Sequence, residues 1–245
     1  MPVQDRRRGE NAPGRVPLSR DQIVRAAIEL IDERGVRELS MRALGQRLGV
    51  EGMALYRHVP SRDNLLDAIV QRVLDDLYGD PDVHLSPHEG WQDYLSRIAH
   101  GLRRLALQHP QVFPLIATRP PAAPWIRPPL RSLRWIDAFL AGLAGEGFDD
   151  SSTVYAYRAF SSFLLGHLLL EVSALGVDTG PADEPDPATP TLAGSDSLAT
   201  YPSVQRLAPA LAENRFTEEF EESLANLLER LELERSGQPP PRRTA

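Results

Sequence analysis

The sequence predicts an all-α protein, and three observations support this fold class. Apolar residues recur at three- and four-residue spacings through most of the chain, which is the period of an amphipathic helix. Ser, Asp and Gly stand where helices would begin and end. Strand-type alternation and internal repeats are absent from the sequence. With 245 residues, 42% of them hydrophobic and 25% charged, the chain is long enough to bury a sizeable core.

The first predicted helix lies just after an N-terminal segment that shows no periodicity. Residues 1–17 are rich in Pro, Gly and Arg and are expected to be a disordered arm. The helix then covers about 21–35 and is preceded by Ser19 or Arg20, with Ser19 as its N-cap. Gly35 is expected to end it in a left-handed conformation.

Two short helices are predicted next, joined by a tight turn. The first begins after Ser40 and ends at Gly49, which supplies the turn. The second covers about Glu51 to His58 and is stopped by Pro60. Two short helices that cross at a small turn are typical of a helix-turn-helix.

The rest of the chain is predicted to form longer helices. They cover about 62–79, 90–108, 125–145, 150–175 and 214–234, with a short helix or turn over 109–120. The Pro- and Asp-rich segment 176–203 and the tail 236–245 are expected to be disordered.

The helix-turn-helix carries the residues that could bind DNA. A second helix with small residues at its N-terminus can enter the major groove without a clash. Its outward residues are predicted to be Gly52, Met53, Ala54, Tyr56, Arg57 and His58. Ser40, Tyr56 and Arg62 are expected to reach phosphates, Arg42 and Arg57 to donate to bases or phosphates, and Glu51 to lie in the same interface.

An ordinary packing role is the alternative for these residues. Tyr56 could be half-buried, and Arg57 and His58 could form a solvated face. The charge distribution favours DNA binding weakly: the net charge is −7, but the N-terminal part is mildly basic and the remainder acidic.

The stretch "LSMRALGQRLGVEGMALYRHVPSRDNLLDAIV" resembles the N-terminal domain of the TetR family of transcriptional repressors. The resemblance implies a three-helix DNA-binding domain over 18–64 and a larger C-terminal domain over 65–235 that dimerises and binds an effector. "GWQDYLSRIAHGLRRLALQHPQVFPLIATRP", "EGFDD" and "SSFLLGHLLLE" are similar to the tetracycline-repressor-like C-terminal class.

The chain departs from the members of that class that bind a tetracycline–magnesium chelate. The resemblance places Leu115 at their metal-ligating His, and Leu cannot bind a hard cation. Tyr78, Ile98 and Leu102 replace drug-contacting residues. We therefore expect no magnesium site and no cofactor, but a pocket for a more apolar ligand. Its expected residues are Tyr78, Ile98, Leu102, Phe113, Leu115 and His167; alternatively, these residues fill a core without a ligand.

The sequence gives little support for a metal site or an enzyme active site. His84 and His88 have a metal-like spacing, but Pro87 between them argues against a helix there. His167 lies in an apolar run, where a satisfied core residue is the alternative to a ligand contact. Trp91, Trp125 and Trp135 are interpreted as core or interface residues. No phosphate loop or nucleophile elbow is visible, so an enzyme is not expected.

Apolar stripes on the two long C-terminal helices indicate a possible subunit contact. They comprise Val154, Tyr157, Phe160, Leu164 and Leu168, and Phe216, Phe220, Leu224, Leu227, Leu228 and Leu231. The family resemblance implies that they form a four-helix bundle with a second copy. Packing within one chain is the alternative.

The sequence thus predicts a homodimeric, ligand-responsive repressor that binds palindromic operator DNA and an unidentified small-molecule effector. Without a membrane-length apolar run or a secretory signal, it is expected in the cytoplasm. The alternatives are a helical small-molecule-binding or scaffold protein whose helix-turn-helix no longer binds DNA, and, with least support, a helical enzyme.

Overall fold

The computed structural model describes residues 18–83, 87, 89–119, 126, 132–179 and 201–237, and this part of the chain contains helices and no strands. The N-terminal elements are α1 (Arg20–Arg34), the 3-10 turn η1 (Val36–Glu38), α2 (Met41–Leu48) and α3 (Gly52–Leu55). The remaining helices are α4 (Arg62–Tyr78), α5 (Trp91–Gln108), α6 (Phe113–Thr118), α7 (Leu133–Gly145), α8 (Asp150–Ala174), α9 (Pro202–Leu211) and α10 (Phe216–Arg235).

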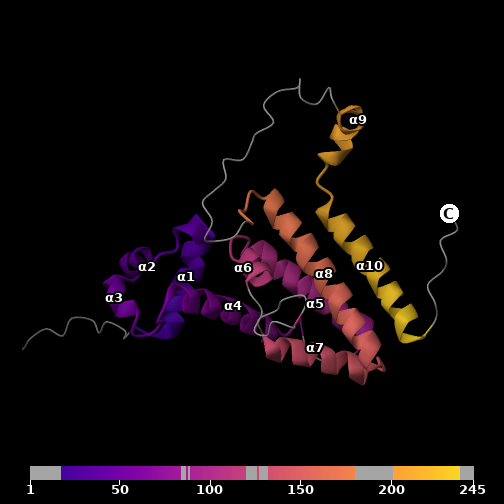
Figure 1. Ribbon diagram of the computed structural model, residues 1–245, viewed down its shortest axis with the longest axis horizontal. Helices are drawn as coiled ribbons and strands as arrows, with labels where there is room; N and C mark the ends of the chain where they lie inside the picture. Colours follow the sequence, from indigo (N-terminus) through magenta and orange to yellow (C-terminus); the bar gives the residue numbers. More distant parts are fainter. Residues whose placement is uncertain are drawn as a thin grey trace, which may run out of the picture.

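The N-terminal helices form a small unit at one end of the molecule. Figure 1 shows α1, α2 and α3 at that end, with α4 leading away from them towards the other helices. The capping predictions for this unit are confirmed. Ser19, Ser40 and Ser61 each accept a hydrogen bond from a backbone N–H of the first turn, which satisfies one of the free donors at each helix start.

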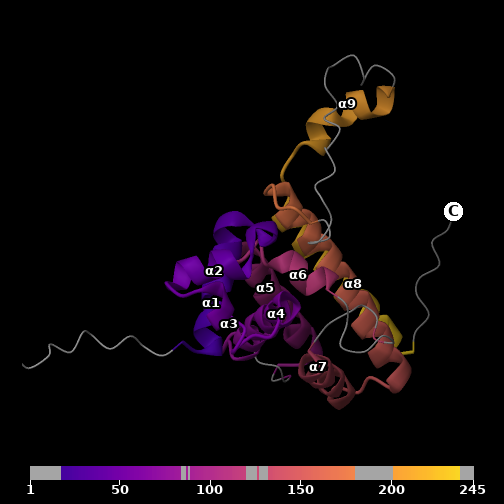
Figure 2. The same ribbon diagram turned by 60° about the vertical axis from the view of Figure 1, so that its left-hand side comes forward.

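The larger unit is built around α8. This helix packs against α5, α6, α7 and α10. Helices α8 and α10 lie side by side in Figure 1, and α10 lies behind α8 in Figure 2. The buried apolar side chains of the two units form one continuous cluster. Helix α4 joins them, with Leu65 and Ile69 fully buried among the N-terminal helices and the rest of the core.

Three predictions of local structure were wrong in detail, and one element was missed. The third helix is one turn long, because residues 56–58 form a turn and not helix. Gly35 has a positive φ of 82°, but its ψ of 162° lies outside the left-handed helical region, so the chain leaves α1 extended. The turn η1 was not predicted. The predicted loop 176–203 extends too far, because α9 begins at Pro202.

Several predictions lie outside the described residues. These are the arm 1–17, residues 180–200 of the predicted loop, residues 238–245 of the tail, and the beginning of the helix expected at 125. Helix α7 begins at Leu133 with Ser132 as its N-cap. In the described helices, no segment has both the length and the apolar character needed to cross a membrane.

Candidate nucleic-acid interface and effector cavity

Helices α2 and α3 cross closely because two glycines meet at their crossing. A Cβ atom on Gly45 would lie 2.8 Å from the carbonyl oxygen of Val50 and 2.9 Å from the backbone N of Gly52. A Cβ on Gly52 would lie 3.0 Å from the carbonyl oxygen of Met41. Gly52 was expected to point outward, and this is corrected: it faces the backbone of α2, where a Cβ atom would make a tighter contact than usual. Gly45 was missed by the sequence analysis.

The turn between the two helices follows the prediction. Gly49 adopts the left-handed conformation, with φ 65° and ψ 33°, and the backbone N–H of Val50 donates to the carbonyl of Gly45. Leu55 is fully buried and holds α3 against the core. The short α3 is therefore fixed by a tight turn, a glycine contact and one apolar anchor.

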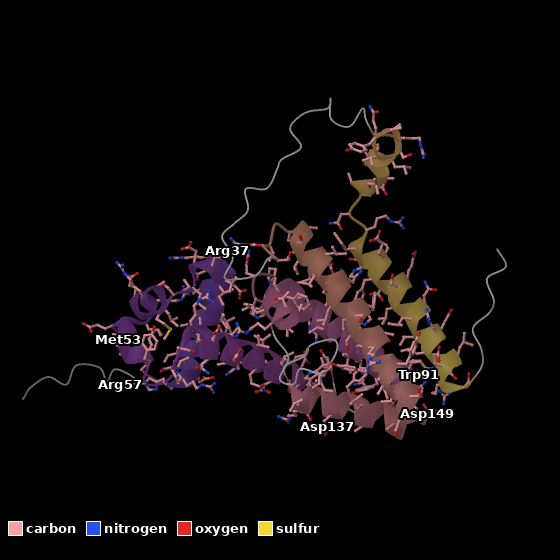
Figure 3. All side chains as sticks on the ribbon, in the orientation of Figure 1. Arg37, Met53, Arg57, Trp91, Asp137 and Asp149 are labelled. Atoms are coloured by element: carbon pink, nitrogen blue, oxygen red, sulfur yellow. The ribbon has the colours of Figure 1, made fainter. Side chains whose placement is uncertain are left out.

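Side chains project from the outer face of α3 and the turn after it. Met53 is 74% exposed and Tyr56 is 42% exposed, which is unusual for large apolar side chains. Met53 and Arg57 lie at the end of the molecule opposite Trp91 and Asp149 (Figure 3). Glu51 and Arg57 are exposed, whereas Ala54 and His58 are partly buried.

The two arginines of this face have no partner in the described chain. Neither Arg42 nor Arg57 forms an ion pair or hydrogen bond with another described residue, and both are exposed. Arg47, also on α2, is different: it makes hydrogen bonds of 2.7–2.9 Å to Glu33 and Glu29, which raise its pKa. Positive charge is therefore available at Arg42 and Arg57 and neutralised at Arg47.

Ser40 and Arg62, the other predicted phosphate contacts, already have partners within the protein. The hydroxyl of Ser40 accepts from the Ala43 N–H at 3.1 Å, which leaves its own hydrogen available to donate. The Arg62 guanidinium donates to the carbonyls of Leu39 and Val36, both at 3.1 Å. Arg62 therefore ties the start of α4 to the segment before α2, and its phosphate contact remains a prediction.

A small cavity lies between α4, α5, α6, α7 and α8, with a free volume of about 30 Å³. Leu74 of α4, Leu102 of α5 and Ile116 of α6 contribute to it, and α7 and α8 supply the aromatic side chains Trp135, Phe139, Tyr157 and Phe160. Charged side chains are absent from its described lining. The cavity is therefore apolar and much smaller than a typical ligand pocket of ~300–1,000 Å³.

Only one of the six predicted ligand residues, Leu102, lines this cavity. Ile98, Phe113 and Leu115 are buried in the core. Tyr78 is partly buried, with the guanidinium carbon of Arg134 3.8 Å from its ring centroid. His167 lies between α8 and α10, its Nε2 3.2 Å from the carbonyl oxygen of Phe216.

The aromatic residues of the cavity were assigned other roles from the sequence. Trp135 was interpreted as core or interface, and Tyr157 and Phe160 as part of a subunit stripe. Helical periodicity shows that such residues are buried but does not distinguish a core from a cavity wall.

The described residues contain no cluster of His, Asp or Glu that could hold a metal ion. His84 and His88 lie outside the described residues. Leu115 is buried among apolar neighbours and offers no ligand atom to a cation.

A polar contact connects the N-terminal unit to the larger one. Nδ1 of His109, at the end of α5, lies 2.7 Å from Oδ2 of Asp32 on α1. This hydrogen bond raises the pKa of His109, against the opposing effect of burial. The contact fixes the position of α1 relative to the turn between α5 and α6.

Comparison with known proteins places both units in one family. The profile for the tetracyclin repressor-like C-terminal domain matches residues 85–234, and that for bacterial regulatory proteins of the tetR family matches residues 23–69. The chain belongs to the TetR family. The tetR-family profile covers both helices of the helix-turn-helix, α2 and α3.

Individual relatives agree with this assignment. An HTH-type transcriptional regulator of Saccharopolyspora erythraea is 35% identical over 63% of this chain and 61% of its own length. The class D tetracycline repressor protein of Escherichia coli is 30% identical over 71% of this chain and 76% of its own. The chain thus spans less than two thirds of the length of the Saccharopolyspora erythraea regulator.

A solved structure shows the same fold. The crystal structure of a possible TetR family transcriptional regulator from Streptomyces coelicolor A3(2) superimposes with a TM-score of 0.67. It is 30% identical and covers 87% of this chain and 98% of its own.

Proposed function

We propose that this TetR family protein is a homodimeric, ligand-responsive repressor that binds palindromic operator DNA in the cytoplasm. The observation that carries the proposal is the face of α3 and its following turn, where Met53, Tyr56 and Arg57 are exposed and the arginine is unpaired within the described chain. A surface that exposes large apolar side chains together with cationic ones is typical of a binding site.

The proposed DNA contacts follow from the placement of these residues. The one-turn α3 inserts into the major groove, where Met53 and Ala54 contact base edges. Arg42 and Arg57 donate to phosphates or guanines, while Ser40 and Tyr56 hold the backbone. Glu51, His58 and Arg62 complete the proposed interface, with Arg62 acting mainly by positioning α2.

The proposed dimer uses the face of α8 that the single chain leaves uncovered. Exposed residues recur there at every fourth position, at Val154, Arg158, Ser162, Gly166 and Leu170. The other stripe residues of α8 are buried within the chain, as are Phe220, Leu224 and Leu231 of α10. Because the small residues Ser162 and Gly166 allow close approach, a second α8 can pack there. Two recognition helices would then meet half-sites ~34–36 Å apart.

The proposed effector acts through α4. Leu74 lines the cavity near one end of this helix, and Arg62 binds the N-terminal unit at the other. A ligand that enlarges the cavity must displace α4 or its neighbours and so change the separation of the two recognition helices. Its effect is limited by the difference in its affinity for the two states.

Selection of bound fragments from genomic DNA tests the proposal. We expect an enriched palindrome that the purified protein shifts at nanomolar to micromolar concentration, with affinity that falls steeply between 50 and 200 mM salt. If no genomic fragment is selectively bound at low salt, the repressor proposal is wrong and a helical binding protein without DNA affinity remains.

A further inference from the structure

The cavity between α4 and α8 contains a buried donor without an acceptor. The indole Nε1 of Trp135 is buried and has no hydrogen-bond partner among the described residues. Trp135 lines the cavity, and its side chain is more than nine-tenths buried. Buried polar groups are almost always paired, so an unpaired donor at a cavity wall indicates where an acceptor would bind.

The remaining wall defines the kind of molecule that carries this acceptor. Phe139 lies with its ring centroid 5.8 Å from that of Tyr157 and 5.6 Å from that of Phe160. These rings favour a flat, apolar ligand. Burial raises the pKa of Tyr157 to about 12, so the phenol stays neutral at physiological pH.

The described lining of the cavity carries no charged side chain, which disfavours an ionic ligand. A carboxylate, an ammonium or a metal chelate would lose its hydration here without gaining an opposite charge. A neutral ligand avoids this cost, and one oxygen acceptor is sufficient to satisfy Trp135.

We propose that the effector is a neutral, ring-containing molecule with a carbonyl or ether oxygen, and that Trp135 Nε1 donates a hydrogen bond to that oxygen. This inference rests on the proposed function, because it specifies the ligand of the same regulator. Ser132 and Ser161 also line the cavity and are buried, so their hydroxyl groups can bind a second polar atom.

Because the cavity is small, ligand binding requires its walls to move. A free volume of about 30 Å³ holds no six-membered ring. The ligand must therefore separate the walls of the cavity, which include Trp135 and Phe139 on α7 and Leu74 on α4. Ligand binding thus displaces α4 or its neighbours.

Two probes of nearly equal shape test the hydrogen bond. 1-Tetralone carries a carbonyl oxygen, whereas tetralin is the corresponding hydrocarbon. The full chain, labelled with 15N-tryptophan and kept free of DNA, is titrated with each probe and followed by the indole N–H resonances. The chain has three tryptophans, and the variants Trp91→Phe and Trp125→Phe assign the Trp135 signal by elimination.

We expect 1-tetralone to bind at least ~5-fold more tightly than tetralin and to move the Trp135 indole proton downfield. In Trp135→Phe the two probes should bind alike, because the donor is gone while an aromatic ring remains. Trp91→Phe is the matched control, since Trp91 is equally buried but packs against Phe148, away from the cavity. It should keep the preference.

Equal binding of the two probes to the wild-type protein would overturn the proposal, and so would the absence of binding by both at millimolar concentration. If Trp135→Phe does not fold, the indole shift in the wild-type protein decides alone. These titrations contain no DNA, so their outcome does not depend on whether the protein binds an operator. Operator binding is tested independently by fragment selection.

Discussion

Gly45 sets the distance between α2 and α3. In Gly45→Ala, the added methyl group would lie within 3 Å of the Val50 carbonyl and the Gly52 backbone, neither of which can rotate away. We expect the free energy of unfolding to fall by ~1–3 kcal/mol, as for overpacked cores, and DNA affinity to fall further because α3 is displaced. Urea denaturation and a mobility-shift titration measure the two effects.

Gly145→Ala is the matched control for this substitution. A Cβ at Gly145, the last residue of α7, meets nothing within 4 Å in the chain, so only the helix propensity changes. This variant should be stabilised by up to ~1 kcal/mol. Equal effects of the two substitutions would show that the crossing does not depend on Gly45.

Arg57 provides the clearest test of the DNA interface. Its exposed guanidinium has no partner in the described protein, so Arg57→Gln should change stability by less than ~0.5 kcal/mol. Affinity for the selected operator should fall by ~1–3 kcal/mol if the side chain binds a base, and a phosphate contact would instead reduce the salt slope by about 1. Mobility shifts over a salt series distinguish the two.

Arg34→Gln removes the same charge from the exposed last turn of α1 and serves as the control. It should leave operator affinity within about twofold of the wild type. Loss of affinity in Arg34→Gln but not in Arg57→Gln would place the interface elsewhere on the N-terminal unit.

Most helices could be predicted from the sequence because their signals are local. The serine caps at Ser40 and Ser61 and the turn at Gly49 depend on neighbouring residues alone. The closeness of Gly45 to Gly52 could not be predicted, since it depends on the angle between two helices. Helix α9 was missed because Pro202 and Pro209 obscure an apolar spacing that, in the described chain, buries no residue.

The lining of the cavity also could not be predicted from local sequence signals. Its walls come from five helices that are far apart in sequence, and Leu102 is the one predicted ligand residue that lines it. The residues inferred from the family resemblance lie on α4, α5, α6 and α8, whereas α7 also lines the cavity through Trp135 and Phe139. The unpaired indole of Trp135 becomes visible only once α7 is placed against α8.

The contact between α1 and α5 should make stability depend on pH. The hydrogen bond from His109 to Asp32 raises the pKa of the imidazole above its ordinary value of 6.5, and Asp76 adds to the effect. Stabilisation is therefore complete below about pH 6.5 and is lost as the pH rises through the raised pKa of the folded protein. We expect Tm to decrease over this range more in the wild type than in His109→Gln.

Thermal unfolding followed by circular dichroism between pH 5.5 and 9 measures the difference. Asp32→Asn should flatten the same part of the curve, because it removes the partner that raises the pKa. Parallel curves for the wild type and His109→Gln would show that the contact does not stabilise the folded state.

At the scale of the whole molecule, the proposed repressor depends on the coupling of three regions through α4 and α8. The proposed DNA face lies at one end of α4 and the cavity lies near the other, while α8 lines the cavity on one face and carries the uncovered stripe on another. Because the buried apolar cluster is continuous between the units, a displacement at the cavity cannot be absorbed by a loose linker. Dimerisation converts this displacement into a change in the spacing of two recognition helices.

Gly166→Glu tests that step, because it places a charge on the stripe without touching the chain's own atoms. Two such charges would face each other across a two-fold axis, so we expect the dimer dissociation constant to rise at least ~10-fold. Affinity for the palindrome should fall as the dimer dissociates, since the two half-sites are no longer bound by linked modules.

Gly145→Glu is the matched control for this substitution. Gly145 is also exposed and also has no neighbour within 4 Å, but it lies at the end of α7. Analytical ultracentrifugation should show Gly145→Glu as a dimer and Gly166→Glu as largely monomeric, with equal Tm values at low concentration. A Gly166→Glu protein that remains dimeric would move the subunit contact away from this face of α8.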